Sequence, residues 1–595
     1  MPLIVSAQRL FGAFLVVLLL TACATAPTGE DFTAWSERFA ADWVRQMPES
    51  STMSRYFAAE EQAQLDARFS AMGDEARNAR RELAKQGLRE LEPYLAGALP
   101  RDQRAGALTM RWSLRRVIAD APFEDHGFAF AQTFGLQVRY QSLFAENQPL
   151  RRAADLPAYL SRLGAMAQRI DDTLALQRRA VTRGFKPPRF IAERARTQVR
   201  MLVDGPLDDE PVLTAFKRRL DAVSDLDTAA REQALARARQ LVGEGVRPAW
   251  QRVASFLDEL LPTTTQDAGL WRLPQGEQAY AQALANNTTT SMSAEEIHRL
   301  GEREVARIEA IMDRLLRELG HAQGSVKDRM AAMHAAHQPA ADPDPRPALM
   351  QRYAEHVRDV ERRAAALFNL RPKAPVEVRR VGPLTERTAS ASYTMPTPDG
   401  ARPGVMWVPL PGPNFNILGM RTLAVHEASP GHHFQLALQQ ETTSLPRWRR
   451  LRVFGGGSAH SEGWALYAER LAIEEGWYDG DVPSLLGAWD AQLFRARRLV
   501  VDTGLHAKRW SRERAIAFGI SAQEVERYVV NPGQATAYMV GMLRIVQLRE
   551  QARAALGSRF SLRDFHDLVL STGSVPLDVL GEVVTDWVQR GGRGV

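Results

Sequence analysis

Apolar residues recur at spacings of three and four along most of this chain, which is the period of an amphipathic helix. One such stripe runs through Val305, Ile308, Met312, Leu315 and Leu319. Ser293 and Glu296 form a capping box just ahead of it, the usual start of a helix. The pattern predicts helices over about 32–370 and again from about 421 to the C-terminus.

Strand signals are confined to the stretch between these two helical regions. Residues 376–381, 391–395 and 404–409 are short runs with strand composition, and a Pro-Asp-Gly turn at 398–400 separates the last two. These runs predict a small antiparallel β-sheet. The expected fold class is therefore mainly α, with one small sheet.

Composition indicates a globular protein with a large core. Of the 595 residues, 45% are hydrophobic and 25% are charged, which excludes long disorder and a multi-span membrane protein. We expect a single large helical domain over 32–595, which the proline-rich loop at 339–347 could divide into lobes of about 32–340 and 348–595. The net charge of +6 is spread over the chain, so nucleic acid is not an expected partner.

The N-terminus resembles a bacterial lipoprotein signal. An apolar run over 10–20, too short for a transmembrane helix, leads into Leu-Thr-Ala-Cys, which ends at Cys23. This arrangement predicts a signal peptide over 1–22, a tether over 23–31 and a lipid on Cys23, although a plain secretion signal would have a similar apolar run. Ala24 is not the Asp that retains such proteins at the inner membrane. We therefore expect anchoring in the cell envelope, at the outer membrane facing the periplasm.

Histidines are concentrated in one short stretch. Four of the 12 histidines lie within 35 residues, where even spacing would place about 0.7. They are His426, His432, His433 and His460. Because Cys23 is the only cysteine, any metal in this region would be held by histidine and carboxylate, a ligand set more typical of catalytic than of structural zinc.

The pair His426-Glu427 begins a zincin motif, in which the glutamate activates a water molecule. In the ordinary motif the second histidine lies four residues after the first, but Pro430 occupies that position here, so the helix cannot be unbroken. Two geometries remain. On a regular helix His433 would return to the same face, whereas a bulge would favour His432.

Zinc also needs a third protein ligand and an open position for water. Glu462, in a helical segment after a Gly-Gly-Gly loop, is the candidate. Glu469 lies seven residues further on the same helical face and could be an alternative ligand or orient one. His460 could be a ligand, or it could lie behind the ligands or belong only to the loop. The sequence predicts one zinc ion.

Two motifs resemble the bacterial domain-of-unknown-function family 885. They are His-Glu-Ala-Ser-Pro-Gly-His-His-Phe-Gln at 426–435 and Glu-Gly-Trp-Ala-Leu-Tyr-Ala-Glu at 462–469. Further matching stretches are 269–271 with Tyr280, 402–404, 501–506 and 531–538. That family in turn resembles the helical gluzincin metallopeptidases. The resemblance implies a gluzincin-like helical fold with the small sheet near the cleft, zinc as cofactor and peptides as substrates.

The resemblance also implies roles for single residues. Gluzincins of this group carry Gly before the second zinc histidine, which Gly431-His432 matches and which favours His432. They use a downstream Tyr or His to hydrogen-bond the oxyanion, and Tyr538 and His506 are the candidates here. Asp502, one helical turn before His506, could orient it.

The sequence-based hypothesis is a membrane-anchored zinc hydrolase, most simply a peptidase. Two alternatives stay open: a metal hydrolase of a non-peptide amide or ester, and a catalytically silent lipoprotein that binds peptides. The intact Glu427 argues against the silent form, because a binding protein has no use for a carboxylate that activates water.

Overall fold

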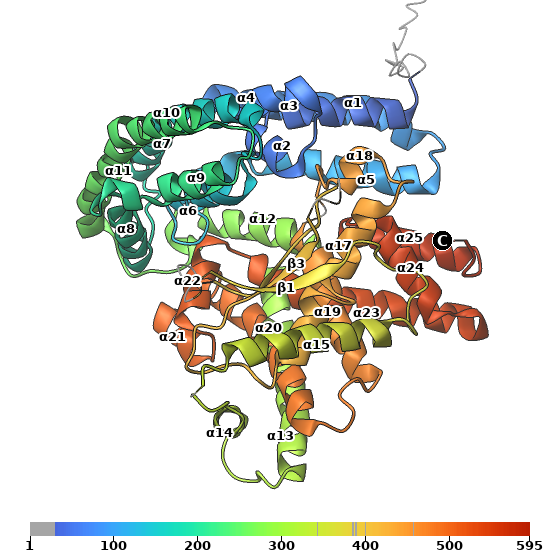
Figure 1. Ribbon diagram of the computed structural model, residues 1–595. Coiled ribbons are helices and arrows are strands. Elements are labelled where there is room, and N and C mark those ends of the chain that lie inside the picture. The colour runs from blue at the N-terminus through green and yellow to red at the C-terminus, as the bar shows by residue number, and fades with distance from the viewer. Residues whose placement is uncertain are drawn as a thin grey trace, which may run out of the picture.

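The structure is a computed structural model that describes residues 30–341, 343–382, 386, 389–398, 400, 402–455 and 457–594. It is mainly helical, as the sequence predicts (Figure 1). The predicted signal peptide, Cys23 and most of the tether lie outside the described residues. Among the described residues, no helix is both long enough and apolar enough to cross a membrane.

In the described part of the chain, fifteen α-helices precede the first strand. They are α1 (Phe32–Arg45), α2 (Pro48–Ser54), α3 (Ala59–Asp66), α4 (Gly73–Ala96), α5 (Arg101–Ala119), α6 (Leu136–Ser142), α7 (Leu156–Thr182), α8 (Arg189–Val203), α9 (Pro211–Asp221), α10 (Thr228–Leu241), α11 (Arg247–Leu260), α12 (Gly276–Thr288), α13 (Ala294–Glu318), α14 (Val326–Ala336) and α15 (Arg346–Ala364). The expected capping box at Ser293 and Glu296 is present at the start of α13.

Three strands and the remaining helices follow. They are β1 (Val376–Arg380), β2 (Ser392–Thr394), β3 (Gly404–Val408), α16 (Met420–Glu427), α17 (His432–Glu441), α18 (Arg447–Arg450), α19 (Ser458–Glu474), α20 (Val482–His506), α21 (Arg512–Ala517), α22 (Ala522–Val530), α23 (Ala537–Leu556), α24 (Leu562–Thr572) and α25 (Leu577–Gln589).

The small sheet is mixed rather than wholly antiparallel. Its strand order is β1-β3-β2, with β2 antiparallel to β3 as expected and β1 parallel to β3. The prediction was wrong for β1 because β3 is the central strand. The chain leaving β1 crosses to the far edge of β3, forms β2 there and then turns back, so β1 and β3 run the same way. Asp399 of the predicted turn lies outside the described residues.

The hydrophobic cores do not follow the loop at 339–347. The largest core joins α1, α4 and α5 to the C-terminal helices, including α19, α20 and α23–α25. A second core lies within residues 130–260, whose helices α7–α11 form the arm at the left of Figure 1. The N-terminal helices therefore share their main core with the segment that carries the histidine cluster. The single domain over 32–595 stays a prediction.

Two glycines set how closely α19 and α23 approach each other. A Cβ at Gly463 would lie 2.5 Å from backbone atoms of Gly541, and one at Gly541 would collide with the carbonyl of Ala459. Only glycine allows two helix backbones to come this near. Because Gly463 follows Glu462 directly, this crossing fixes the position of the predicted third ligand.

Candidate metal centre

The helix that carries His426 breaks where the sequence places its proline. α16 ends at Glu427, and α17 begins at His432 after the Ser-Pro-Gly segment. Pro430 has no N–H to continue the helix, and Gly431 donates its own N–H to the carbonyl of Val425, 3.0 Å away. A Cβ on Gly431 would collide with the carbonyl oxygens of Val425 and His426. His432 follows His426 by six residues instead of the usual four, and the break in the helix accommodates these two additional residues. The structure therefore has the bulged geometry and not the regular helix.

Trp464 of α19 holds this break against the third helix of the site. Its indole N–H donates to the carbonyl of Pro430 at 2.8 Å, and its side chain is fully buried. α16, α17 and α19 are therefore fixed relative to one another by buried contacts.

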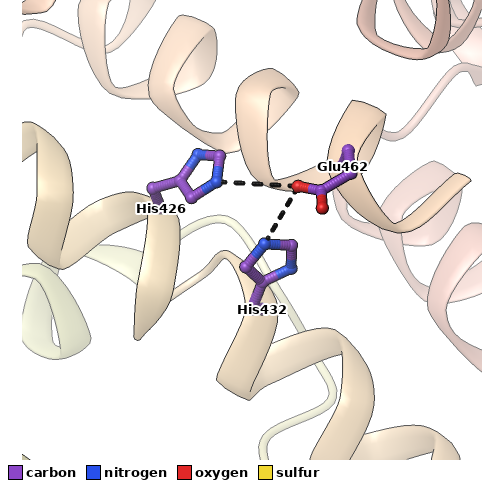
Figure 2. Close-up of side chains that lie close together, drawn as sticks. All are labelled: His426, His432 and Glu462. Atoms are coloured by element: carbon purple, nitrogen blue, oxygen red, sulfur yellow. Dashed lines mark ion pairs between the residues drawn. The ribbon is translucent and has the colours of Figure 1, made fainter. Parts of the chain in front are cut away.

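His426, His432 and Glu462 converge at this junction, one from each of α16, α17 and α19 (Figure 2). The Nε2 atoms of His426 and His432 lie 3.9 and 3.3 Å from Oε2 of Glu462. One ligand atom from each of the three residues lies within 4.8 Å of the others. Ligands at zinc distances of about 2.1 Å would be separated by about 3.4 Å in a tetrahedral site, so small side-chain shifts would suffice.

The protonation pattern of the cluster suits a cation. Nδ1 of His426 lies 2.7 Å from Oε1 of Glu469, so this nitrogen carries the proton and donates it. Burial, and then the neighbouring His432, hold the pKa of His426 well below its usual value, so the ring is neutral. Its Nε2 lone pair therefore faces the oxygen of Glu462, which is itself an acceptor. Two buried acceptors facing each other are unfavourable unless a cation lies between them.

Glu462 fits the role of an anionic ligand. Its Oε2 atom is buried and has no hydrogen-bond partner, while 20% of the side chain stays accessible. Burial works to raise the pKa of Glu462, but the nearby positive charges, that of His432 foremost, lower it to about 2. The carboxylate is therefore ionised at neutral pH, and its Oε2 atom makes no hydrogen bond of good geometry, although Nε2 of His432 lies only 3.3 Å away. This orphaned atom shows that the residues present fit a bound metal ion.

Glu469 lies on the far side of the His426 ring from Glu462. Its side chain is 1% exposed, and Arg495 of α20 lies 3.4 Å from the oxygen that receives the His426 proton. Of the two roles expected for Glu469, the structure places it to orient His426 rather than beside the other ligand atoms. Arg495 was not found from the sequence, because its partner lies on a different helix.

Glu427 is buried beside the cluster, and no hydrogen bond or ion pair of its carboxylate is found among the described residues. Burial, reinforced by the nearby charge of Glu462, raises the pKa of Glu427 to about 7, against the opposing effect of His432. A carboxylate with a pKa near neutrality is suited to accept a proton from water and to return it.

Tyr538, at the start of α23, also reaches the cluster. Its ring lies parallel to that of His426, with centroids 6.4 Å apart. The guanidinium of Arg498 lies 4.0 Å from the centre of the Tyr538 ring. The structure thus brings one of the two expected oxyanion donors to the site.

His506, the other expected oxyanion donor, has both ring nitrogens occupied elsewhere. Its Nδ1 accepts from the N–H of Leu270, and its Nε2 donates to the carbonyl of Tyr528, each at 3.1 Å. The expected contact between Asp502 and His506 is wrong: Asp502 accepts instead from the hydroxyl of Tyr280 at 2.6 Å and from the N–H of Gly533. Buried backbone groups compete for these side chains, and sequence spacing does not reveal them.

The two remaining histidines of the cluster point away from it. Nδ1 of His433 lies 2.9 Å from the hydroxyl of Tyr393 on β2, and Nδ1 of His460 accepts from the N–H of Val575 at 3.1 Å. Of the neighbouring pair, His432 rather than His433 is the one brought beside His426.

The cavities in the described part of the chain include two of similar volume. One of about 330 Å³ reaches Glu469 and Arg495 and is also lined by α16 and the loop before it. The other, of about 380 Å³, lies among α12, α8 and the loop at 120–128 and contains none of the predicted site residues. Of these two, the first borders the candidate metal centre, behind the His426 ring.

Comparison with known proteins gives the family but no activity. A candidate lipoprotein from Colwellia psychrerythraea has a similar structure, with a TM-score of 0.86 and 29% identity over 94% of this chain and all of that one. A candidate lipoprotein of unknown function from Shewanella oneidensis shares the fold, with a TM-score of 0.71 and 19% identity over 93% of this chain and all of that one. No curated protein matches. A model described as a bacterial protein of unknown function, DUF885, matches residues 48–584, and the chain therefore belongs to the DUF885 family.

Proposed function

We propose that this protein is a zinc-dependent hydrolase that cleaves peptides, anchored in the bacterial cell envelope by a lipid on Cys23. The observation that carries the proposal is the convergence of His426, His432 and Glu462 around a buried, ionised carboxylate oxygen that makes no hydrogen bond of good geometry. The similarity of the metal-binding motif to that of the helical gluzincins supports the same function. The candidate lipoproteins of similar structure support the envelope location, at the outer membrane facing the periplasm.

Each residue of the site has a role in this proposal. His426, His432 and Glu462 would hold one zinc ion, which would polarise the substrate carbonyl and acidify a water molecule. Glu427 takes the proton of that water as it attacks and returns it to the leaving amine. Tyr538 donates a hydrogen bond to the oxygen on which negative charge develops. Glu469 keeps the His426 ring in the tautomer that leaves Nε2 free to bind metal.

The proposal is tested by metal content and cleavage measured on the same preparation. The full-length protein is purified, its zinc is determined by elemental analysis, and a mixed peptide library is incubated with it. Glu427→Gln is the test variant, and Glu475→Gln, an exposed glutamate just after α19, is the matched control. We expect about one zinc per chain in all three proteins, and cleavage by the wild type and Glu475→Gln only.

The other outcomes separate the alternatives. Absence of zinc after growth with added metal would refute the metal centre. Bound zinc with hydrolysis of esters or non-peptide amides but not peptides would replace the substrate class. Bound zinc with no hydrolysis, unchanged by Glu427→Gln, would identify a silent peptide-binding lipoprotein.

A further inference from the structure

The cavity of about 380 Å³ has the size and the lining of a small-molecule site. It lies between α8 of the arm and α12 and α22 below it (Figure 1). Sites for small ligands are usually about 300–1,000 Å³ in volume and mostly apolar, with a few polar groups. Aromatic, proline and aliphatic side chains form much of this wall: Phe123, Phe128, Phe185, Pro187, Pro188 and Ile191.

Two fully buried side chains of α20 hold another part of the cavity wall in place. His506 accepts from the N–H of Leu270 and donates to the carbonyl of Tyr528, each at 3.1 Å. Asp502 accepts from the N–H of Gly533 at 3.0 Å. Leu270 lines the cavity itself, and so do the neighbours of Tyr528 and Gly533 in the chain. The family-matching stretches that carry Leu270, Asp502 and Gly533 therefore meet behind this cavity.

Arg272 brings a positive charge into the wall. It ends a helical turn that begins at Leu270, and its Nη1 donates to the carbonyl of Lys186 at 2.5 Å. Its Nε is buried without a partner, and its Nη2 makes no hydrogen bond among the described residues. Burial lowers the pKa of Arg272 to about 10, so the guanidinium is still protonated at neutral pH.

No carboxylate is within ion-pair distance of Arg272 in the described part of the chain, and the acidic residues of the wall have other partners. Glu124 forms an ion pair with Arg77 at 3.0 Å. Asp120 accepts from the side-chain amides of Gln282 and Asn286 at 2.9 and 2.7 Å. A half-buried guanidinium without a counter-charge is costly, and a bound anion would relieve that cost.

Three stacked rings form the aromatic part of the wall. The His126 ring contacts Phe123 and Phe185 edge to face, with centroids 5.6 and 4.9 Å apart. Nε2 of His126 donates to the carbonyl of Pro274 at 2.8 Å, and burial lowers the pKa of His126, so the ring is neutral. Arrangements of this kind favour an aromatic ring in the ligand, which can pack edge to face against them.

We propose that this cavity is a second ligand site, which binds a small organic carboxylate with an aromatic body through Arg272. A guanidinium pairs with a carboxylate more strongly than with a neutral amide, because the contact is charge-assisted. The apolar wall then covers the body of the ligand. The cavity contains none of the residues assigned to the metal centre, so this inference does not depend on the proposed hydrolase function.

The test compares an acid with the amide of the same shape. Dissociation constants of phenylpropionate, phenylpropionamide, acetate and inorganic phosphate are measured by calorimetry. The proteins are the full-length wild type, Arg272→Met, Arg272→Lys and Arg358→Met. Arg358 is the matched control, because it is exposed on α15, away from the lining of this cavity. Each titration is repeated after a chelator has removed bound metal, since a carboxylate could also bind a metal ion.

We expect phenylpropionate to bind the wild type and Arg358→Met about tenfold to a hundredfold more tightly than phenylpropionamide, with or without metal. Acetate and phosphate should bind more weakly than phenylpropionate, because they lack the apolar body. Arg272→Met should bind the acid no better than the amide. Arg272→Lys should keep part of the preference, because the charge remains but the planar fork is lost. Circular dichroism shows whether each variant is folded.

The natural source of the carboxylate is distinguished by one further probe. N-acetylphenylalanine carries the same ring and acid as the C-terminal residue of a peptide. Tighter binding of this compound than of phenylpropionate would support the site and assign it to peptide ends. Tighter binding of phenylpropionate would support the site and assign it to free aromatic acids.

Several results would overturn the inference. They are equal binding of acid and amide by the wild type, absence of binding, binding of phosphate as tight as that of phenylpropionate, and binding that metal removal abolishes but Arg272→Met does not. A test without any substitution uses a photoreactive benzophenone carboxylic acid on the wild type. Labelling within 120–128 or 185–191, prevented by excess phenylpropionate, supports the site, and labelling only elsewhere refutes it.

Discussion

The contact between His426 and Glu469 allows a graded test of the metal centre. Nδ1 of His426 donates to Oε1 of Glu469 over 2.7 Å, and the Glu469 side chain is 1% exposed. Water is therefore poorly placed to replace a lost acceptor. Carboxylates that orient a metal-binding histidine contribute about tenfold to a hundredfold to metal affinity, or about 1.4 to 2.7 kcal/mol.

The two substitutions at Glu469 should differ in size of effect. Glu469→Gln keeps an oxygen that can accept the proton but removes the charge, so we expect zinc affinity to fall by about tenfold. Glu469→Ala leaves the buried Nδ1–H without an acceptor and lets the ring turn, so we expect a fall of about a hundredfold. The dissociation constant is measured by competition with a chromophoric zinc chelator at constant pH.

Glu475→Gln, an exposed change just beyond the same helix, is the control and should bind zinc as the wild type does. The reasoning is refuted if Glu469→Ala binds zinc as tightly as the wild type while remaining folded. It is also refuted if the Gln variant is weaker than the Ala variant, because the order of the two follows directly from the hydrogen bond.

Three further predictions concern the fold that positions the site. Gly431→Ala should abolish zinc binding, since its Cβ would collide with the carbonyl of His426 and displace the break between α16 and α17; equilibrium dialysis against zinc measures the loss. Gly463→Ala should lower the free energy of unfolding by about 1–3 kcal/mol in urea, because its Cβ would lie 2.5 Å from Gly541. Asp502→Asn should flatten the pH dependence of stability, because burial raises the pKa of Asp502 from 3.8 to about 7. The raised pKa makes the wild type lose stability as pH rises between these values, which urea unfolding at pH 5 and pH 8 would show.

Each of these predictions has a control or a contradicting result. Gly164→Ala in α7 is the glycine control, because its Cβ would meet nothing nearer than 3.4 Å and alanine favours a helix. Undiminished zinc binding by Gly431→Ala, or wild-type stability of Gly463→Ala, would mean that the backbone yields more easily than the contacts indicate. An equal loss of stability with pH in Asp502→Asn and the wild type would assign that loss to other groups.

Local chemistry made several features readable from the sequence alone. The capping box at Ser293 and Glu296, for example, starts α13. The helical break follows from Pro430, which cannot donate a backbone hydrogen bond. Such features depend on residues within one or two turns of each other, so the mainly helical class and the region of the histidine cluster were predictable.

The tertiary structure decided which side chains meet. It turns His432 toward Glu462 and His433 toward Tyr393, although the two histidines are adjacent in the chain. It also occupies both nitrogens of His506 with backbone groups, which sequence spacing does not indicate. The physical reason is that these contacts join helices far apart in the sequence, and their positions depend on close packing such as that at Gly463. The sequence by itself determined the residue types available for a metal site; only the packed helices determined their partners.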